Sequence, residues 1–590
     1  MKNAEIAKIF YEISFFLMME EVAFKPQAYE KAAISIKDLN QDVGEIYKKG
    51  GLKALEDIPG VGKGIAERIE EFLKTGQIRD YEKFKKKYPI DIENLTAIEG
   101  IGAKTILKFY KKLGVKNVKD LEKAVLEGKI RKLEGFGEKT EANILKGIEF
   151  LKKSSGRFVL GFILPTIREI ESRLKKLKEV ENIAVAGSVR RWKETIGDAD
   201  FLIIVKGKPL AFAKASAGKV MDFFVSMPEV DRVFAHGRTK SAIRLKDGLE
   251  VDVRVVSPES FGAALNYFTG SKEHNISLRQ IAIKKGYKLN EYGLFKKGKR
   301  IGGKTEEEIY ELLGLRYIEP ELRENFGEIE ASRKNQLPKL IGYGDLRGDL
   351  QIQTDWTDGS SSIEEMAEEA RQIGLEYIAI TDHTKSLAMT GGSDEKKLLK
   401  QIDYINKLNA RYKTRNERFR ILTGAEVNIL KDGSLDIKDE VLEKLDLVGA
   451  AIHSNFNLSK EEQTKRMIKA MENPNVDIIF HPTGRIIKQR EPYEIDINEI
   501  IRTAKRTGTV LEIDAYPDRL DLKDDHIKKA LRAGVKLAID SDAHNPAHFK
   551  YLEFGIAQAR RGWTEKKDVI NTMSLDNLMK FLKLPKDKRF

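Results

Sequence analysis

The sequence has no cysteine among its 590 residues. Disulfides and thiolate metal sites are therefore excluded, and any metal must be bound by histidine, aspartate or glutamate. No apolar run approaches the roughly 18 residues that a membrane-spanning helix needs. The first 21 residues have a short apolar patch interrupted by acidic residues, which favours an amphipathic helix over a signal peptide. We therefore expect a cytoplasmic protein without a membrane partner.

Basic residues give the chain a formal net charge of +13, and this charge is unevenly distributed. Residues 1–150 carry a net charge of +3, residues 151–320 carry +11 and residues 321–590 carry −1. An evenly spread charge would describe only a solvated surface. Concentration in the middle segment instead predicts a groove for a polyanion.

The first 150 residues are typical of helices joined by glycine turns, and one pattern occurs three times: IPGVGKGIAERIEEF at 58–72, IEGIGAKTILKFYKKL at 98–113 and LEGFGEKTEANILKGI at 133–148. Each copy places Gly-x-Gly before an amphipathic helix, whose first N–H groups can hold a phosphate without reading bases. A single Gly-x-Gly is usually only a turn, but three in one frame predict helix-hairpin-helix clamps for DNA. The clamp residues are Gly60, Gly62, Lys63, Gly100, Gly102, Lys104, Gly135, Gly137 and Lys139.

Residues 151–320 have a different pattern, in which strand-like runs alternate with helical stretches. The runs are ENIAVAGS at 181–188, DADFLIIV at 198–205 and LEVDVRVV at 249–256. They predict an α+β domain. Gly187-Ser188 predicts a turn that a phosphate can approach closely, with Arg190 and Arg191 following on a strand.

Three aspartates in this region predict a site for metal-dependent nucleotidyl transfer. Asp198 and Asp200 are two residues apart on a strand, so their carboxylates face one side. Such aligned like charges favour a divalent cation between them, and Asp252 adds a third carboxylate from a later strand. Two magnesium ions on this set would lower the pKa of an attacking 3′-hydroxyl and neutralise the leaving pyrophosphate. A D-x-D pair alone is weak, but the G-S turn, the basic residues and the later Asp strengthen the prediction.

The segment GSVRRWKETIGDAD at 187–200 resembles the nucleotidyltransferase signature of family X DNA polymerases, the relatives of DNA polymerase beta. NYFTGSKEHNISLR at 266–279 resembles the thumb motif of that family. The resemblance implies that Asp198 and Asp200 bind both metals, Mg²⁺ or Mn²⁺, and that Asp252 binds the catalytic one. It also implies a site for the incoming dNTP made of Gly187, Ser188, Arg191, Gly197, Tyr267, Phe268, Gly270, Asn275 and Arg279.

The same resemblance assigns individual roles. Ser188 and Arg191 would contact the triphosphate. The segment from Tyr267 to Gly270 would press on the sugar and exclude a 2′-hydroxyl. Asn275 would bond the minor-groove edge of the incoming base, and Arg279 would touch the template strand.

Two positions depart from the pattern of the family. Arg68 stands where the animal repair enzymes have a lysine that forms a Schiff base with a deoxyribose-phosphate. Arginine cannot act as an amine nucleophile at ordinary pH, so the resemblance does not carry lyase activity to this position, although Lys63 lies one turn away. Ile163 stands where the family has an arginine that contacts the triphosphate, a change that would weaken nucleotide binding.

From Asp345 onward, apolar strand-like runs that end in His, Asp or Glu alternate with helical stretches, which predicts a (β/α) barrel with its site at the strand C-termini. Six of the eight histidines lie between 383 and 548, and four end such runs. The segment resembles the PHP (polymerase and histidinol phosphatase) domain at the C-terminus of bacterial and archaeal family X polymerases. The implied metal ligands, for Mn²⁺ or Zn²⁺, are Asp358, His383, Glu426, His453, His481, Asp542 and His544.

Two ligands of that family are replaced in this chain. Its frame GDLQIQTDWTDG at 348–359 has Gln351 and Gln353 where the family has a His-x-His pair. An amide oxygen is a weaker transition-metal ligand than an imidazole nitrogen. We therefore expect a PHP domain with an intact fold but weakened 3′–5′ exonuclease and abasic-site (AP) endonuclease activity.

The sequence as a whole predicts a multidomain protein with an all-α helix-hairpin-helix N-terminal region, an α+β nucleotidyltransferase palm and thumb, and a C-terminal (β/α) PHP barrel. The expected segments are a helical domain at 1–80, a fingers-like domain at 81–150, the palm at 151–257, the thumb at 258–320, a linker at 321–345 and the PHP domain at 346–590.

The expected function is gap-filling DNA synthesis in repair, by a nucleoid-associated monomer acting on gapped or primer-template DNA with dNTPs. One alternative is a PHP phosphodiesterase whose polymerase half has become a DNA-binding adaptor. Another is a non-enzymatic scaffold for DNA ends, which would bind without metal-dependent turnover.

Overall fold

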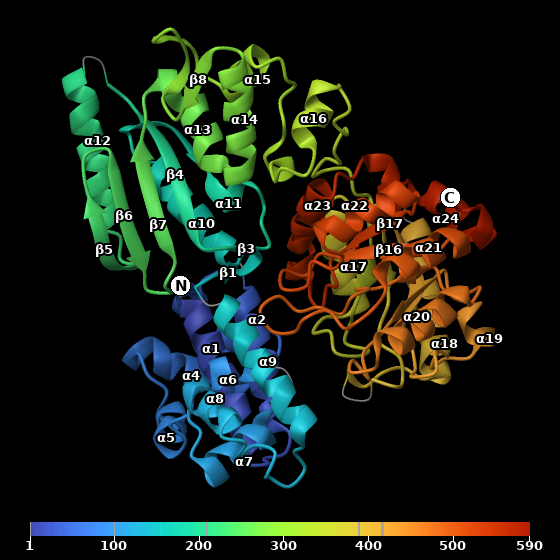
Figure 1. Cartoon of the computed structure of the whole chain (residues 1–590). Helices are drawn as coiled ribbons and strands as arrows, with labels where there is room; N and C mark the ends of the chain where they lie inside the picture. The colour runs from blue at the N-terminus through green and yellow to red at the C-terminus, as the bar shows by residue number, and fades with distance from the viewer. Residues whose placement is uncertain are drawn as a thin grey trace.

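A computed structural model describes residues 2–39, 41–98, 101–154, 156–207, 210–387, 390–414 and 418–590. Figure 1 shows three parts: N-terminal helices, a mixed middle part that contains the open sheet, and a C-terminal barrel beside both. None of the helices in these ranges is both long and apolar enough to cross a membrane.

The N-terminal part is entirely helical in the ranges described. Its helices are α1 (Lys2–Met19), α2 (Lys25–Asp38), α3 (Val43–Glu56), α4 (Lys63–Thr75), α5 (Arg79–Lys87), α6 (Ile92–Thr96), α7 (Ala103–Leu113), α8 (Val118–Leu126) and α9 (Glu138–Ser154). Helix α1 belongs to two cores at once. Phe10 and Ile13 pack with α2, α3 and α4, whereas Phe15 and Phe16 pack with residues of α6 to α9. A helix buried on several sides must be apolar around most of its surface, as α1 is.

The palm is a five-stranded sheet in the order β2-β4-β7-β6-β5, in which β4 and β7 are parallel and the other neighbours antiparallel. Its elements are β1 (Phe158–Val159), α10 (Leu160–Lys175), β2 (Val180–Val185), α11 (Gly187–Arg190), β3 (Thr195–Ile196), β4 (Asp198–Val205), α12 (Leu210–Val225), β5 (Val230–His236), β6 (Lys240–Leu245) and β7 (Glu250–Val255). Phe201, Val253 and Ile243 face a core that contains residues of α10 and α12. The residues that alternate with them lie on the opposite face, and this open face carries the aspartates.

The prediction that Arg190 and Arg191 follow on a strand is wrong. Strand β2 ends at Val185, and Gly187 to Arg190 form the short helix α11. Gly187 has a φ of +65°, a conformation that favours glycine, so the chain turns there instead of extending the strand.

The thumb combines short helices with a three-stranded sheet, β10-β9-β8. Its elements are η1 (Pro258–Ser260), α13 (Phe261–Thr269), α14 (Lys272–Lys284), β8 (Tyr287–Asn290), β9 (Gly293–Lys296), β10 (Lys299–Gly302), α15 (Glu306–Leu312), η2 (Pro320–Leu322) and α16 (Glu328–Arg333). The polar segment after residue 320 packs against this thumb. Arg323 is fully buried and lies 2.5 Å from Glu306, and Glu328 lies 2.6 Å from His274. The polar residues of this segment thus form buried ion pairs, which a reading of hydrophobic periodicity does not detect.

The C-terminal part is a nearly closed barrel of seven parallel strands in sequence order, β11 to β17. The strands are β11 (Gly348–Ile352), β12 (Tyr377–Ile380), β13 (Arg420–Asn428), β14 (Leu447–Ala451), β15 (Ile478–Ile479), β16 (Val510–Asp514) and β17 (Leu537–Asp540). The helices are α17 (Ile363–Gln372), α18 (Glu395–Thr414), α19 (Asp439–Leu442), α20 (Lys460–Glu472), α21 (Ile497–Thr507), α22 (Asp524–Ala533), η4 (Pro546–Tyr551), α23 (Leu552–Arg561), η5 (Lys566–Asp568), η6 (Ile570–Thr572), α24 (Leu575–Lys583) and η7 (Lys586–Lys588). A bridge between Ile352 and Ala543 brings the two ends of the sheet together.

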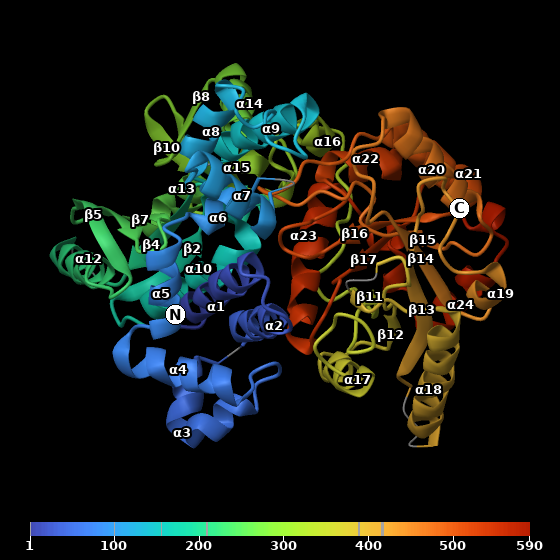
Figure 2. The ribbon, with the colours of Figure 1, turned by 90° about the horizontal axis from the view of Figure 1, so that it is seen from below.

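The barrel and the palm share a packed interface, and α23 lies on the side of the barrel that faces the palm (Figure 2). Leu520, Tyr551 and Phe554 of the barrel belong to the hydrophobic core of the palm. Buried Arg485 pairs with Glu194 at 2.6 Å and 3.1 Å. The barrel is therefore a docked partner of the polymerase-like half.

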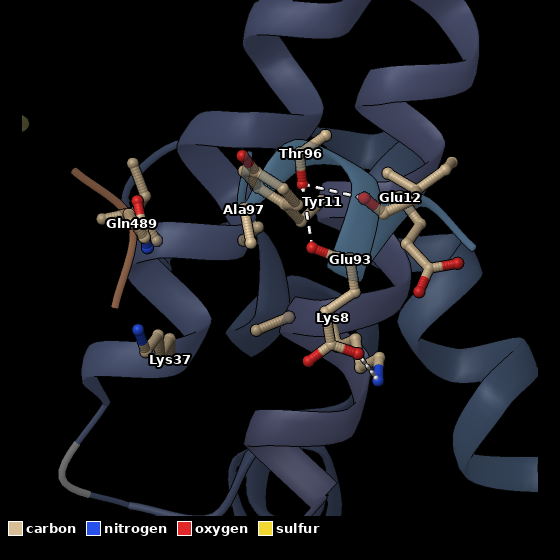
Figure 3. Close-up of a pocket in the computed structure, with 12 residues that line it drawn as sticks. Lys8, Tyr11, Glu12, Lys37, Glu93, Thr96, Ala97 and Gln489 are labelled. Atoms are coloured by element: carbon tan, nitrogen blue, oxygen red, sulfur yellow. Dashed lines mark hydrogen bonds and ion pairs between the residues drawn. The ribbon is translucent and has the colours of Figure 1, made fainter. Parts of the chain in front are cut away.

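The N-terminal helices also meet the barrel. A cavity of about 470 Å³ lies where Gln489 of a barrel loop approaches α1, α2 and α6 (Figure 3). Of its charged lining residues, Lys8 and Glu93 pair with each other at 2.6 Å. Glu12 accepts a hydrogen bond from Tyr81, and Lys37 lies over the ring of Phe162, so each of the four already has a partner. We assign this cavity to domain packing.

Glu194 tests the docking of the barrel. Glu194→Ala leaves Arg485 buried without its partner, so we expect a loss of about 2–4 kcal/mol in the free energy of unfolding. Urea titration measures this loss. The matched control is Arg168→Ala, which breaks the half-exposed pair with Glu553 and should cost less than about 1 kcal/mol. Equal losses in the two variants would contradict the assigned role of Glu194.

Candidate functional site

The three predicted aspartates lie on neighbouring strands of the open palm face. In the parallel register of β4 and β7, Asp200 stands opposite Asp252, and Asp198 lies two residues before Asp200 on the same face. Gly187 is in close contact with this group, since a Cβ atom there would lie 2.9 Å from Oδ2 of Asp200. The fold thus brings the three carboxylates together and needs glycine beside them.

The protonation of these carboxylates reflects their crowding. Burial, together with the charges of Asp198 and Asp252, raises the pKa of Asp200 to about 6. Burial and the charge of Asp252 also raise the pKa of Asp198. Lys240 Nζ and an Arg254 nitrogen lie 3.2 Å and 3.5 Å from Oδ2 of Asp252. A partly exposed, oxygen-only group with excess negative charge fits divalent metals of the Mg²⁺ and Mn²⁺ class.

Two of the predicted nucleotide contacts, Arg191 and Asn275, already bond to other parts of the chain. Arg191 Nε lies 3.0 Å from Glu324, and its guanidinium also donates to the carbonyl of Thr269. Tyr267 is 40% exposed, and Asn275 donates to the Tyr267 carbonyl at 2.7 Å. The remaining predicted contacts lie on α11, in the β3–β4 turn, on α13, at its C-cap and on α14: Gly187, Ser188, Gly197, Phe268, Gly270 and Arg279. Arg191 must therefore exchange a partner to reach a triphosphate.

Arg190 has a structural role that the sequence did not indicate. It forms a bidentate pair with Glu306 of the thumb at 2.6 Å and 3.0 Å and donates to Thr269 Oγ1 at 2.8 Å. Arg190 thus fixes the palm to the thumb beside the aspartates. Lys240 and Arg254 were also missed, although the D-x-R spacing of Asp252 and Arg254 on one strand is a usable signal.

The two positions that depart from the family pattern have structural partners. Arg68 donates to Asp80 and to the carbonyl of Gly64, each at 2.7 Å. Ile163 is buried on α10 within the palm core. Neither side chain is available for the chemistry of the residue it replaces.

Two hairpin turns begin their second helices with glycine. Gly62 and Gly102 are the N-cap residues of α4 and α7 and supply no side-chain cap. Nothing lies within 4 Å of a Cβ built at either glycine, so the space beside the start of each helix is open. Lys63 begins α4, Lys104 lies in α7, Gly135 and Gly137 precede α9, and Lys139 lies in α9. Gly100 lies outside the described residues. The open helix starts suit a phosphate backbone.

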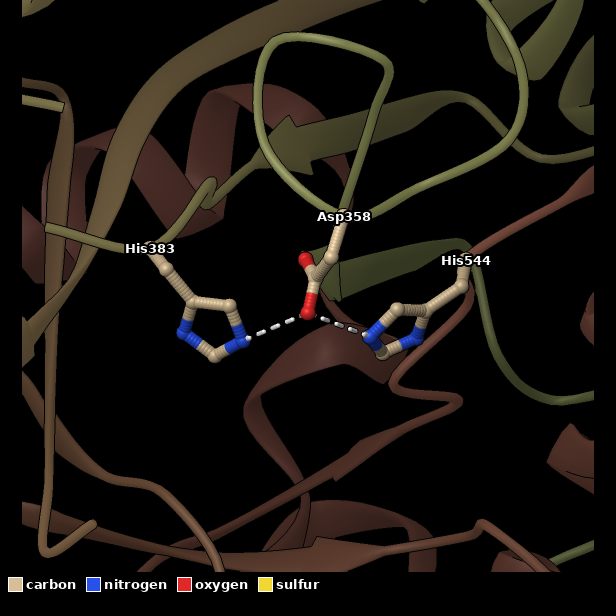
Figure 4. A group of neighbouring side chains, drawn as sticks. All are labelled: Asp358, His383 and His544. Carbon is tan, nitrogen blue, oxygen red and sulfur yellow. Dashed lines mark ion pairs between the residues drawn. The ribbon is translucent and has the colours of Figure 1, made fainter. Parts of the chain in front are cut away.

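The barrel brings two groups of predicted ligands together. In the first, Asp358 Oδ2 lies 3.5 Å from His383 Nε2 and 3.8 Å from His544 Nε2 (Figure 4). The second contains His383, Glu426 and His453. His383 is shared by both groups, so two metal positions would be adjacent.

Glu426 is the centre of the second group. Its Oε1 lies 3.0 Å from His453 Nε2 and 2.9 Å from His481 Nε2. Burial acts in the opposite direction, but His383 and the two other histidines hold the pKa of Glu426 well below its usual range. Burial lowers the pKa of His453 to about 4, so this imidazole is neutral and able to bind a metal near pH 7.

Gln351 and Gln353 both turn their amide nitrogens toward the same atom. Their Nε2 atoms donate to Oε2 of Glu426 at 3.1 Å and 2.8 Å. Their Oε1 atoms are buried and have no hydrogen-bond partner among the described residues. The two amides thus occupy acceptor positions on Glu426 that a metal would use, and the donor set there fits a metal poorly.

Asp542 belongs to neither group but lies beside the first. It lies 3.8 Å from Arg519 Nε and 4.0 Å from His544 Nδ1. Sequence reasoning missed Arg519, and it missed Asn428, whose Oδ1 lies 2.8 Å from His453 Nδ1. Neither residue ends a strand-like run in His, Asp or Glu, the pattern by which the ligands were found.

Fold and site together define a metal-dependent nucleotidyltransferase joined to a phosphoesterase-type barrel. Family comparisons agree, matching a helix-hairpin-helix domain at 1–78, a SAM-like helix-hairpin-helix tandem at 92–149, the DNA polymerase beta thumb at 264–324 and the PHP domain at 349–516. The chain is 37% identical over 588 residues to the DNA polymerase/3′–5′ exonuclease PolX of Bacillus subtilis (strain 168), covering 99% of this chain and 100% of that protein. The chain belongs to this PolX family, and its resemblance to family X polymerases with a PHP domain is confirmed.

Two other relatives each match one half of the chain. A probable phosphatase of Thermoanaerobacter sp. (strain X514) is 33% identical over 238 residues, which cover 39% of this chain and 90% of that protein. DNA polymerase lambda of Rattus norvegicus is 28% identical over 324 residues, which cover 50% of this chain and 52% of that protein.

The raised pKa of Asp200 gives a pH-dependent prediction for the metal-free protein. In the unfolded chain this carboxyl ionises near its ordinary value of 3.8, whereas in the fold it ionises near 6. The repulsion is therefore absent below about pH 4, grows as the pH rises, and is fully present above about pH 6. Asp200→Asn should stabilise the protein by about 1–3 kcal/mol near neutral pH and much less near pH 4, measured by unfolding with a chelator present.

The matched control is Glu181→Gln, which removes an exposed carboxylate from β2 and should have no such pH dependence. A stabilisation by Asp200→Asn that is the same at both pH values would contradict the crowding of the three aspartates.

Proposed function

We propose that the chain is a DNA polymerase that fills short gaps during DNA repair by two-metal nucleotidyl transfer. The observation that carries this proposal is the juxtaposition of Asp198, Asp200 and Asp252 on the open palm face. The dependence on divalent metal follows from the family, and we propose Mg²⁺ or Mn²⁺ for this oxygen-only group.

Different palm residues have different roles in the proposed reaction. Asp198 and Asp200 would hold both metals, and Asp252 would hold the one beside the primer 3′-hydroxyl. When bound, the metals supply Lewis acidity to that hydroxyl and to the leaving pyrophosphate. Lys240 and Arg254 orient the Asp252 carboxylate, and exposed Tyr267 is positioned to contact the sugar of the dNTP.

The substrate is DNA, gapped or primer-template, and the helix starts at Gly62 and Gly102 support contacts to its backbone. We further propose a monomer associated with the nucleoid. The expected segment boundaries and site residues remain part of this proposal.

Asp252→Ala tests the polymerase site. We expect dNTP incorporation on a gapped duplex to fall by at least about 10³-fold, because the carboxylate beside the hydroxyl is lost. Binding of gapped DNA, measured by fluorescence anisotropy, should be nearly unchanged. Glu181→Ala is the control and should keep full synthesis. Retained synthesis by Asp252→Ala would refute the assignment, and so would normal binding without any synthesis by the unmodified protein.

For the barrel we propose a secondary 3′–5′ exonuclease and AP endonuclease activity that is weakened. The group of Asp358, His383 and His544 supports binding of Mn²⁺ or Zn²⁺. The amides of Gln351 and Gln353 on Glu426 support the weakening. A mainly hydrolytic protein with a DNA-binding adaptor is less well supported, because the complete carboxylate set lies in the palm.

Replacing Gln351 and Gln353 with the histidines of the family pattern tests the proposal for the barrel. Gln351→His together with Gln353→His should increase the bound Mn²⁺ or Zn²⁺ by at least one ion per chain and raise 3′ degradation on the order of tenfold. Elemental analysis and release of a labelled 3′ nucleotide measure the two effects. Gln372→His, on the exposed side of α17, is the control.

His481→Ala should remove the residual degradation of the unmodified protein. If the unmodified protein already carries a full metal complement and degrades 3′ ends rapidly, the two glutamines do not have the proposed effect.

A further inference from the structure

A second charged group occupies the free edge of the palm sheet. Strand β5 is the last strand of the order β2-β4-β7-β6-β5, and in Figure 1 it lies beside α12 on the side away from the barrel. The guanidinium carbons of Arg232 and Arg244 lie 5.5 Å and 5.0 Å from the ring centroid of Phe234. Phe234 is 44% exposed. We call Arg232, Phe234 and Arg244 the edge platform.

The edge platform lies on the same face of the sheet as the aspartates. Arg232 pairs with Arg244 across β5 and β6, and Arg244 pairs with Glu250 across β6 and β7. Glu250 is two residues before Asp252, so the side chains of this row point to the side of Asp252. Two strand spacings and two residues along the strand place the edge platform about 12 Å from Asp252.

A local irregularity positions Phe234. The register of β5 on β6 shifts between Val233 and Ala235, so Phe234 has no direct partner there. Such bulges redirect a side chain, and here the aromatic ring stacks with both arginines. Charged side chains alone would be enough to keep this free sheet edge from pairing with a strand of another chain. An exposed aromatic ring adds nothing to that protection, so the arrangement calls for another explanation.

The two arginines of the edge platform outnumber the acidic groups that pair with them. Arg244 pairs with Glu250 at 2.6 Å, whereas Arg232 makes no ion pair within the described part of the chain. Lys240 lies four residues before Arg244 on the same face of β6 and pairs with Asp252 at 3.2 Å, between the edge platform and the aspartates. This edge therefore favours a polyanion that continues past the aspartates.

We propose that the edge platform binds backbone phosphates of the primer strand, upstream of its 3′ end. This rests on the proposed function, because the 3′-hydroxyl is placed beside Asp252. At about 3.4 Å per base pair, the 12 Å separation corresponds to about three or four base pairs. Guanidinium groups bind phosphate oxygens in bidentate fashion, and stacking on Phe234 holds both planes in place before the DNA arrives.

The test compares two gapped duplexes that differ only in the duplex upstream of the primer end, with about ten or about two base pairs. Binding to the full-length protein is measured by anisotropy without divalent metal. Arg232→Gln with Arg244→Gln should weaken binding of the longer duplex on the order of tenfold and reduce its salt slope by about 2. Binding of the shorter duplex should not change.

Two further variants make the result specific. Lys176→Gln with Lys219→Gln removes two exposed charges, one at the C-cap of α10 and one in α12, on the helix-covered face, and should affect neither duplex. Arg232→Lys with Arg244→Lys keeps the charge but not the stacked bidentate geometry, so it should retain the salt slope and lose about threefold in affinity. Thermal unfolding checks that each variant is folded. If a variant is not folded, Phe234→Leu is used in its place and should weaken binding of the longer duplex only.

An equal loss on both duplexes would place the contact elsewhere on the DNA and overturn the proposal, and so would no loss on either. Because the measurement is made without metal, it does not depend on synthesis. Failure of the unmodified protein to incorporate dNTPs would refute the proposed function and leave the binding comparison intact.

Discussion

Repulsion among three carboxylates on two adjacent strands is the constraint on which the polymerase half depends. Parallel pairing of β4 and β7 sets Asp200 directly against Asp252, where burial makes their charge still less favourable. Binding of a ligand of opposite charge must offset the unfavourable free energy of these crowded carboxylates. The neighbouring elements fit that purpose, since Gly187 gives room beside Asp200 and the cations near Asp252 reduce the repulsion without removing it.

At the Glu426 group of the barrel, the acidic side chain is satisfied by the protein, unlike the aspartates of the palm. Glu426 receives two histidines on one oxygen and two glutamine amides on the other, so its charge is already compensated by the protein. A carboxylate satisfied in this way gains less from a metal than one that is left crowded. The two centres therefore differ in how far the protein alone satisfies the central acid, and the proposed order of their activities rests on this difference.

Much of this arrangement could be predicted from the sequence, because it depends on local spacing. Alternation on a strand placed Asp198 and Asp200 on one face, and histidines at strand ends indicated the barrel site. Contacts between distant segments could not be predicted in this way. Arg191 meets Glu324, and Glu194 meets Arg485 nearly three hundred residues later. Those pairings follow from tertiary packing, for which the sequence has no periodic signal.

The most direct test of the account follows extension and degradation of one labelled primer end on the same gapped duplex, with Mg²⁺ and Mn²⁺ compared. The account predicts that extension exceeds degradation by on the order of 100-fold with either metal when dNTPs are present, a difference of about 2.7 kcal/mol in activation free energy. Degradation that equals or exceeds extension under these conditions would contradict the claim that the palm holds the complete catalytic centre.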